Sequence, residues 1–254
     1  MAATLFLACG QAAATVVEVQ TVVGNFKINL FDEQTPETVN NFLEYVRSGA
    51  YANTVVHRSD PSFVIQMGGF AYSPGQLPEA ISVGPAVINE PELSNVQGTV
   101  AMAKLPSDEN SATSQFFINL DDNTGLDSNN GGFTVFGQVL DDGMEVVNAI
   151  ADIPRVAFAV PFNELPVRNY TQADASNNVI PTDDNLVIVL DVVIIDDNVI
   201  TNPQLVPVPN TAFDSPVALP VPIESSSSGG AIAWFSLLSL LVIAIQRRTR
   251  ASGL

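Results

Sequence analysis

The sequence has almost none of the residues that form covalent cross-links and common metal sites. Among its 254 residues there is one cysteine, Cys9, and one histidine, His57. A single cysteine cannot form an intramolecular disulfide. Zinc sites usually need three or four Cys or His ligands, so a zinc site of the usual kind is not expected either.

Positive charge is also scarce. Nine Lys and Arg residues stand against 27 Asp and Glu residues, which gives a formal net charge of −18. Three of the nine, Arg247, Arg248 and Arg250, lie at the extreme C-terminus, so the rest of the chain is more acidic still. Nucleic-acid binding needs a basic surface that neutralises phosphates. The acidity of this chain therefore argues against nucleic acid as a partner. The acidity is most simply explained as a solvated surface.

The N-terminal segment, residues 1–14, has the pattern of a targeting signal. It is apolar and ends in Ala12-Ala13-Ala14, which is typical of a signal-peptidase site, although it lacks a basic start. We predict a signal whose beginning is missing, cleaved after Ala14, and hence an exported protein of the periplasm, cell envelope or extracellular space. A lipoprotein signal ending at Cys9 and a buried first strand are the alternatives.

The C-terminal segment has three parts. Residues 201–228 are rich in Pro and then in Ser and are predicted to form an extended linker. Residues 229–254 contain Gly229-Gly230, an apolar run and an Arg-rich end. This order resembles the GlyGly-CTERM sorting tail, which implies a membrane segment and a rhomboid-type sorting protease as a partner. The basic end would stay in the cytoplasm and the body of the protein outside it. A plain C-terminal anchor is the alternative.

Residues 15–200 have the pattern of one mainly β domain. Two Val- and Ile-rich runs flank Gly24-Asn25 and predict a hairpin, and further short strands follow. Helices are predicted over 35–49, with Thr35 as the cap, and over 143–153. Residues 156–185 are polar and irregular and are predicted to be a loop insertion. Many short strands with two helices favour a closed β-barrel whose open ends the helices cover.

Strand alternation gathers several side chains around one cation. Val64 and Gln66 share a face of one predicted strand, and Gln115 and Phe117 share a face of another. With Arg58 they predict an apolar recess that has amide donors and one guanidinium. No Ser/His/Asp set, phosphate-binding glycine loop or carboxylate pair accompanies them, so the pattern favours binding and polarisation over covalent chemistry.

Four ordered motifs resemble those of the cyclophilins, the peptidyl-prolyl cis-trans isomerases, and most resemble the exported bacterial branch. They are VVHRSDPSFVIQMGGF, NVQGTVAMAK, SATSQFFINL and FTVFGQVLDDGMEVVNAI. The resemblance, from Val16 to Ile195, implies a closed eight-stranded antiparallel β-barrel capped by two α-helices. It also implies rotation of X-Pro bonds in unfolded or flexible polypeptides, with no metal or cofactor. We expect a monomer.

The resemblance also implies a role for individual residues. Arg58 falls on the catalytic arginine, with Phe63 at the proline pocket. Gln66 and Gln115 match the glutamines that orient the arginine and bind the substrate backbone. Catalytic roles are thus predicted for Arg58, Phe63 and Gln66, and substrate binding for Val64, Met102, Ala103, Lys104, Gln115, Phe117 and Leu126.

Several positions depart from the pattern of the family. Val64 stands where Met is usual, and Lys104 replaces a common Asn. Gly125 stands where many eukaryotic members carry the Trp that governs cyclosporin affinity, so tight drug binding is not implied. Phe133 or Thr134 stands near a usual His or Tyr at the rim of the pocket. These changes leave open a proline-peptide binding module that does not catalyse, and the tail leaves open a surface-anchored structural protein.

The remaining titratable residues are predicted to have no chemical role. His57 and Arg58 are neighbours on a predicted strand, so their side chains should point to opposite faces. His57 is therefore predicted to be structural. A calcium site in DDNTGLDSNN is conceivable from its oxygen ligands, but the spacing of an EF-hand is absent. Solvated turn positions are predicted for Asp121, Asp122, Asp127, Asp141 and Asp142.

Overall fold

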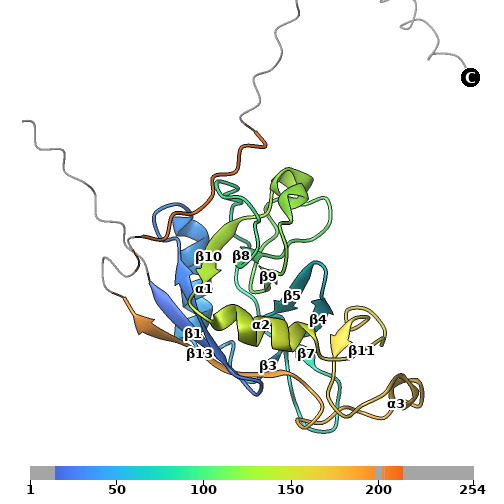
Figure 1. Ribbon diagram of the computed structural model, residues 1–254. Coiled ribbons are helices and arrows are strands. Elements are labelled where there is room, and N and C mark those ends of the chain that lie inside the picture. Colours follow the sequence, from blue (N-terminus) through green and yellow to red (C-terminus); the bar gives the residue numbers. More distant parts are fainter. Residues whose placement is uncertain (1–14, 198–201, 203, 214–254) are drawn as a thin grey trace, which may run out of the picture. The chain divides into compact units, whose positions relative to one another are not determined.

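The computed structural model describes residues 15–197, 202 and 204–213 (Figure 1). The predicted signal at 1–14, the predicted tail at 229–254 and most of the predicted linker lie outside these residues. Within the part of the chain that is described, no helix has the length and apolar character needed to cross a membrane.

Eleven strands form one antiparallel sheet, which curls strongly (Figure 1). Its order is β4-β5-β9-β8-β10-β2-β1-β13-β3-β6-β7. The strands are β1 Val16–Thr21, β2 Asn25–Leu30, β3 Thr54–Val55, β4 Arg58–Asp60, β5 Val64–Met67, β6 Phe70–Ala71, β7 Glu79–Ala80, β8 Thr99–Met102, β9 Phe116–Asn119, β10 Val135–Val139 and β13 Ile188–Asp196. Residues 54–60 contribute strands near both ends of this order: β3 pairs with β13, and β4 pairs with β5.

The mainly β antiparallel architecture is confirmed, but the strand order differs from that of a closed eight-stranded barrel. The order is open, with β4 at one end and β7 at the other. The strands that raise the number to eleven include β6 and β7, each of two residues. A two-residue strand is too short to show an alternating pattern, so the sequence does not predict it.

The two predicted helices are present as α1, Pro36–Arg47, and α2, Gly143–Ala151. α1 buries its apolar face and ends as predicted at Gly49, whose φ of +68° suits glycine. Its start differs from the prediction, because the Thr35 side chain donates to the Phe31 carbonyl and makes no cap bond. The carboxylate of Glu90 instead accepts from the backbone N–H groups of Glu37 and Thr38, at 3.3 and 2.9 Å.

Strand alternation separates the main core from the recess that forms the site. In β9, Phe116 and Ile118 point into the main core, whereas Phe117 lies in a separate cluster with Val64 and Val135. The apolar faces of α1 and α2 complete the main core. In this core the ring of Phe42 lies 5.4 Å from that of Phe116, edge to face. β5 and β9 therefore stabilise the fold with one face and line the recess with the other.

The 156–185 segment is more ordered than a loop insertion. It contains β12, Leu165–Pro166, which pairs with β11, Arg155–Val156, and the short helix α3, Gln172–Ser176 (Figure 1). A capping box of Thr171 and Asp174 begins α3. Buried side chains of the 156–185 segment form a second apolar cluster with residues outside it. The cluster consists of Val55, Val156, Phe162, Leu165, Val167, Tyr170, Ala175, Leu186 and Ile188.

Residues 204–213, within the predicted linker, lie along the domain and are called the C-terminal strap below. The Ser94 N–H donates to the Val208 carbonyl and the Asn210 N–H to the Glu92 carbonyl, each at 2.8 Å. Leu205 packs against the cluster that lines the recess. The described part of the predicted linker is therefore held against the domain.

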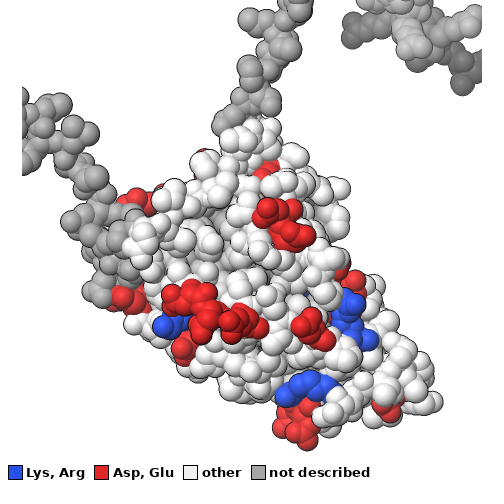
Figure 2. Space-filling view, viewed as in Figure 1, with Lys and Arg blue, Asp and Glu red and all other residues white. Residues whose placement is uncertain are grey.

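Acidic side chains form several patches on the face shown in Figure 2, with few basic ones among them. Among the described acidic residues, Asp127 alone is buried. The predicted solvated acidic surface is therefore present, and Asp127 is the exception to it.

Candidate active site

A recess of about 250 Å³ lies at one end of the strand order, over β4, β5 and β9. Antiparallel register produces it, because Arg58 pairs with Gln66 and Gln66 pairs with Phe117. These three side chains therefore form one row across three strands. The recess is lined by Arg58, Phe63, Val64, Gln66, Lys104, Phe117, Leu126 and Phe133.

The walls of the recess are apolar. Val64 and Phe117 are buried at its base, while Phe63, Leu126 and Phe133 are partly exposed around it. The rings of Phe117 and Phe133 meet edge to face with centroids 5.9 Å apart. Such walls suit a small apolar ring that has no hydrogen-bonding group of its own, as in the side chain of proline.

Arg58 supplies the guanidinium at the rim. Its side chain is 31% exposed, and its Cζ lies 5.6 Å from the centre of the Phe63 ring. Its Nε donates to Oε2 of Glu164 at 2.6 Å, and its Nη2 lies 4.0 Å from Asp60. A carboxylate from the 156–185 segment therefore holds the cation beside the apolar recess.

Gln66 contacts a different partner from the predicted one. Its Nε2 donates to Oε1 of Gln115 at 2.9 Å, and the carboxylate on Arg58 comes from Glu164. Glu164 lies 106 residues from Arg58, in a segment with no clear pattern, and was therefore not among the predicted residues. No local signal in the sequence points to it.

The other predicted substrate-binding residues differ in their placement. Met102 is fully buried in the main core, and Ala103 is partly exposed and packs against the cluster of the recess walls without lining the recess. Gln115 reaches the recess only through its bond to Gln66. Of the two rim candidates, Phe133 lines the recess, while Thr134 is buried and donates to the Asn89 side chain.

Lys104 lines the recess but directs its ammonium group toward the protein. Its Nζ donates to the carbonyls of Asn130 and Gly132 and lies 4.7 Å from the centre of the Phe133 ring. Burial lowers the pKa of Lys104, and the nearby Glu109 partly opposes that effect. Lys104 therefore fixes the turn that carries Phe133, in addition to its predicted place beside the peptide.

Gly69 sets the position of Gln115. A Cβ at Gly69 would lie 2.6 Å from Cγ and Cδ of Gln115, far inside van der Waals contact. We predict that Gly69→Ala displaces Gln115, removes the partner of Gln66 and lowers, about tenfold, kcat/KM for the X-Pro rotation that the motifs imply. Gly125→Ala is the matched control, because a Cβ there meets nothing within 4 Å. An unchanged kcat/KM in Gly69→Ala, or an equal loss in both variants, contradicts this prediction.

His57 is structural, as predicted. It is 2% exposed, and its ring packs edge to face on Phe70 with centroids 4.8 Å apart. Burial lowers the pKa of His57 to about 4, because charging the ring inside the domain is unfavourable. It is therefore neutral at neutral pH and cannot serve as a cation beside Arg58.

The low pKa of His57 predicts a loss of stability in weak acid. The unfolded chain binds a proton on His57 near pH 6.5, whereas the folded chain resists it until about pH 4. Stability is therefore complete above pH 6.5, and roughly 2 kcal/mol is lost on going from pH 7 to pH 5. Urea unfolding at pH 7 and at pH 5 measures this difference in the free energy of unfolding. His57→Gln should lose about 2 kcal/mol less stability than wild type over the same pH change, since the two chains differ at no other residue. Equal losses would refute the assignment.

Asp127 is buried, contrary to the predicted solvated turn. It ends the 3-10 helix η1, Thr124–Asp127, which carries Leu126 to the recess, and a second such turn, η2, spans Asn129–Gly131. Its carboxylate accepts from the Ser94 hydroxyl and from the Asn95 N–H and side-chain amide. Over the described residues, no three His, Cys, Asp or Glu side chains are grouped to hold a metal ion.

The family model of the cyclophilin type peptidyl-prolyl cis-trans isomerase/CLD matches residues 16–172, more than half of the chain. The chain belongs to this family. The isomerase class that the motifs implied is thereby confirmed. The cyclophilin match includes every predicted site residue as well as Glu164.

Relatives and solved structures agree with this membership. The chain is 38% identical over 161 residues to a peptidyl-prolyl cis-trans isomerase of Acinetobacter baylyi, covering 63% of this chain and 84% of the relative. It is 41% identical over 145 residues to peptidyl-prolyl cis-trans isomerase B of Escherichia coli, covering 54% and 85%. A Cryptosporidium parvum cyclophilin crystallised in the presence of the dipeptide Ala-Pro is similar with a TM-score of 0.52. It is 29% identical and covers 71% of this chain and 99% of that one.

Proposed function

We propose that this cyclophilin accelerates rotation about X-Pro bonds in unfolded or flexible segments of exported polypeptides. One observation carries the proposal, namely the guanidinium of Arg58 at the rim of an apolar recess, 5.6 Å from the Phe63 ring. A proline ring seated in the recess would bring its nitrogen toward this cation. The arrangement needs no nucleophile, metal or cofactor.

The chemistry of the proposal rests on amide resonance. Resonance sets a rotation barrier of about 18–20 kcal/mol, and X-Pro bonds isomerise slowly enough to limit folding. When the bond twists, the nitrogen loses conjugation and becomes a better hydrogen-bond acceptor. A donor at that nitrogen then binds the twisted state more strongly than the planar one, which lowers the barrier. Arginine suits this role because it stays charged in a partly apolar site.

The remaining residues of the recess would hold the substrate on both sides of the bond. Val64 and Phe117 form the base for the proline ring, and Leu126 stands at its edge. The Gln66–Gln115 pair offers amide groups to the peptide backbone. In this proposal the ring is held while the carbonyl group before the proline swings.

A peptide assay tests the function directly. The full chain should raise the cis-to-trans exchange rate of an Ala-Pro peptide, measured by NMR exchange spectroscopy and by a protease-coupled assay. The second candidate, a proline-peptide binding module without catalysis, is favoured by the Arg58–Glu164 ion pair, which occupies one donor of the guanidinium. Binding of the peptide with no rise in exchange rate would support that module and sink the isomerase proposal.

Export and membrane attachment form a separate part of the proposal. The apolar residues 1–14 and the Gly-Gly, apolar and Arg-rich order of residues 229–254 support an exported chain with a membrane segment before processing. A rhomboid-type protease would be the partner that removes this segment. Cell fractionation with mass measurement tests it: a C-terminus near Gly229 or Gly230 supports cleavage, and an intact Leu254 contradicts it.

A further inference from the structure

We infer that Glu164 is a positioning residue for the isomerase reaction, holding the guanidinium of Arg58 over the proline recess from the 156–185 segment. The inference rests on the proposed function, since it assigns a role to a neighbour of the proposed catalytic group. The direct evidence is the 2.6 Å contact between Nε of Arg58 and Oε2 of Glu164. Charge-assisted bonds of this length are among the strong hydrogen bonds in proteins.

Glu164 is fixed to β4 through its backbone as well as its side chain. Its carbonyl accepts the N–H of Ser59, the residue next to Arg58, at 2.9 Å. The Ser59 carbonyl in turn accepts from Nη1 of Arg155 in β11, at 3.3 Å. Glu164 of the 156–185 segment and Arg155, just before it, therefore both bind the strand that carries Arg58, and this holds the Glu164 carboxylate in place beside the arginine.

Packing gives Glu164 a rigid base. Phe162 and Leu165, on either side of it in sequence, are buried in the second apolar cluster together with Val55 and Ile188 of the sheet. Moving Glu164 away from Arg58 would open this cluster. The carboxylate is therefore held by the fold before any substrate arrives, which is what preorganisation of a catalytic group requires.

The geometry favours a supporting role over an inhibitory one. With the Glu164 bond in place, Arg58 still lines the recess and lies over Phe63, whereas Glu164 does not line the recess. The bond uses Nε, the donor nearest the side-chain stem. Neither terminal nitrogen of Arg58 donates a hydrogen bond within the described residues, although Nη2 lies 4.0 Å from Asp60. Both remain able to donate to a prolyl nitrogen.

This assignment also accounts for the bond between the two glutamines. The motif assigned the orienting role to Gln66, but Gln66 donates to Gln115. In this assignment Glu164 orients the guanidinium of Arg58, and it does so with a full negative charge, which a neutral amide lacks. The 156–185 segment thus contributes a residue to the site, in addition to covering one side of the sheet.

The test measures kcat and KM for an Ala-Pro peptide with the full chain and its variants. Glu164→Ala should lower kcat about tenfold with KM within twofold of wild type, because misplacing a catalytic group costs rate more than binding. Glu164→Gln keeps an acceptor for Nε and should retain an intermediate kcat. Asp184→Asn removes the same charge from an exposed position of the same segment and should leave kcat unchanged.

Two further measurements separate positioning from a structural effect. The Nε–H NMR signal of Arg58 should be slow to exchange with water in wild type, faster in Glu164→Gln and lost in Glu164→Ala. Because Glu164 acts through Arg58, the double variant Arg58→Ala/Glu164→Ala should be no slower than Arg58→Ala alone. An additional loss in the double variant would overturn the inference.

Each outcome decides a different question. A wild-type kcat in Glu164→Gln and Glu164→Ala, or a faster one, overturns the positioning role while the proposed function stands. A wild-type chain without isomerase activity overturns the proposed function, and the role of Glu164 in it. If Glu164→Ala does not fold, the kcat and the Arg58 signal of Glu164→Gln settle the inference.

Discussion

Replacing Arg58 with alanine is expected to lower isomerase kcat/KM about a hundredfold or more, as loss of a preorganised donor does in other active sites. The alanine variant keeps the apolar walls of the recess, so peptide binding should weaken much less than the rate. A protease-coupled assay with an Ala-Pro peptide measures kcat/KM, and peptide titration by NMR measures the binding.

Two further variants make the arginine experiment specific. Arg58→Lys keeps the charge but has no Nε to meet Glu164, so its kcat/KM should fall between those of wild type and Arg58→Ala. Arg47→Ala removes an exposed arginine of α1 that does not line the recess, and should behave as wild type. Equal rates for Arg58→Ala and wild type would falsify the mechanism even though the fold is that of a cyclophilin.

Replacing Asp127 with alanine is expected to destabilise the domain by about 3 kcal/mol or more. The side chain is 6% exposed, and its carboxylate accepts from the Ser94 hydroxyl and from two N–H groups of Asn95. Without it these buried donors lose their acceptor, and unsatisfied buried groups are costly. Urea unfolding at pH 7 measures the loss in the free energy of unfolding.

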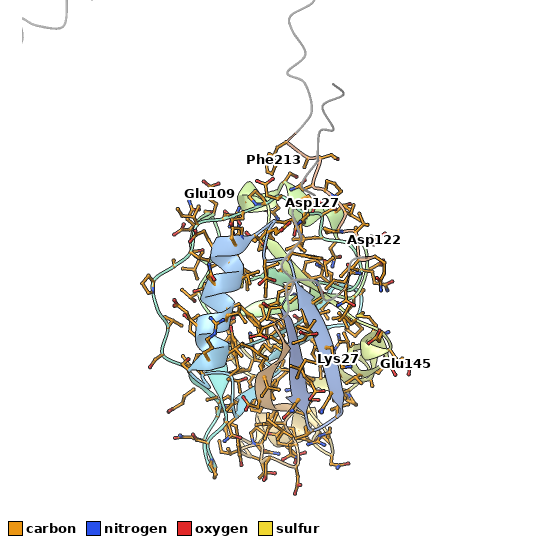
Figure 3. All side chains as sticks on the ribbon, turned by 90° about the vertical axis from the view of Figure 1, so that its left-hand side faces the viewer. Lys27, Glu109, Asp122, Asp127, Glu145 and Phe213 are labelled. Carbon is orange, nitrogen blue, oxygen red and sulfur yellow. The ribbon has the colours of Figure 1, made fainter. Side chains whose placement is uncertain are left out.

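Asp122 provides the control for this loss. It lies on the same loop region as Asp127, and both are labelled in Figure 3. Asp122 is exposed and accepts one backbone bond, from the Gln97 N–H at 3.0 Å, so Asp122→Ala should cost about 1 kcal/mol or less. Because Asp127 fixes Leu126, Asp127→Ala should also raise KM for the peptide. Similar small losses in both variants would contradict the buried role of Asp127.

The C-terminal strap links this buried carboxylate to the rest of the chain. Asn210 donates to the carbonyls of Pro91 and Asp127, each at 2.9 Å. Phe213 lies at the same end of the domain as Asp127 in Figure 3 and faces the backbone of Gly132. Residues of the C-terminal strap, which follows the last strand, thus contact the turn that carries Leu126 and Phe133 to the recess.

Much of the fold could be predicted from local patterns. The hairpin of β1 and β2, the apolar face of α1 and its end at Gly49 each depend on residues close together in sequence. The recess was predictable for the same reason, because alternation within single strands places Val64, Gln66 and Phe117 on one side. Sequence by itself therefore determined the mainly β class, the family and most of the residues of the recess.

Only the tertiary structure decided which distant groups meet. Glu164 reaches Arg58 across 106 residues, and Glu90 caps α1 across 52. The burial of Asp127 likewise depends on Ser94 and Asn95, more than thirty residues away. A carboxylate in a polar stretch has the same local pattern whether it is solvated or paired. Its role is set by the partners that chain folding brings to it, and the local sequence does not contain them.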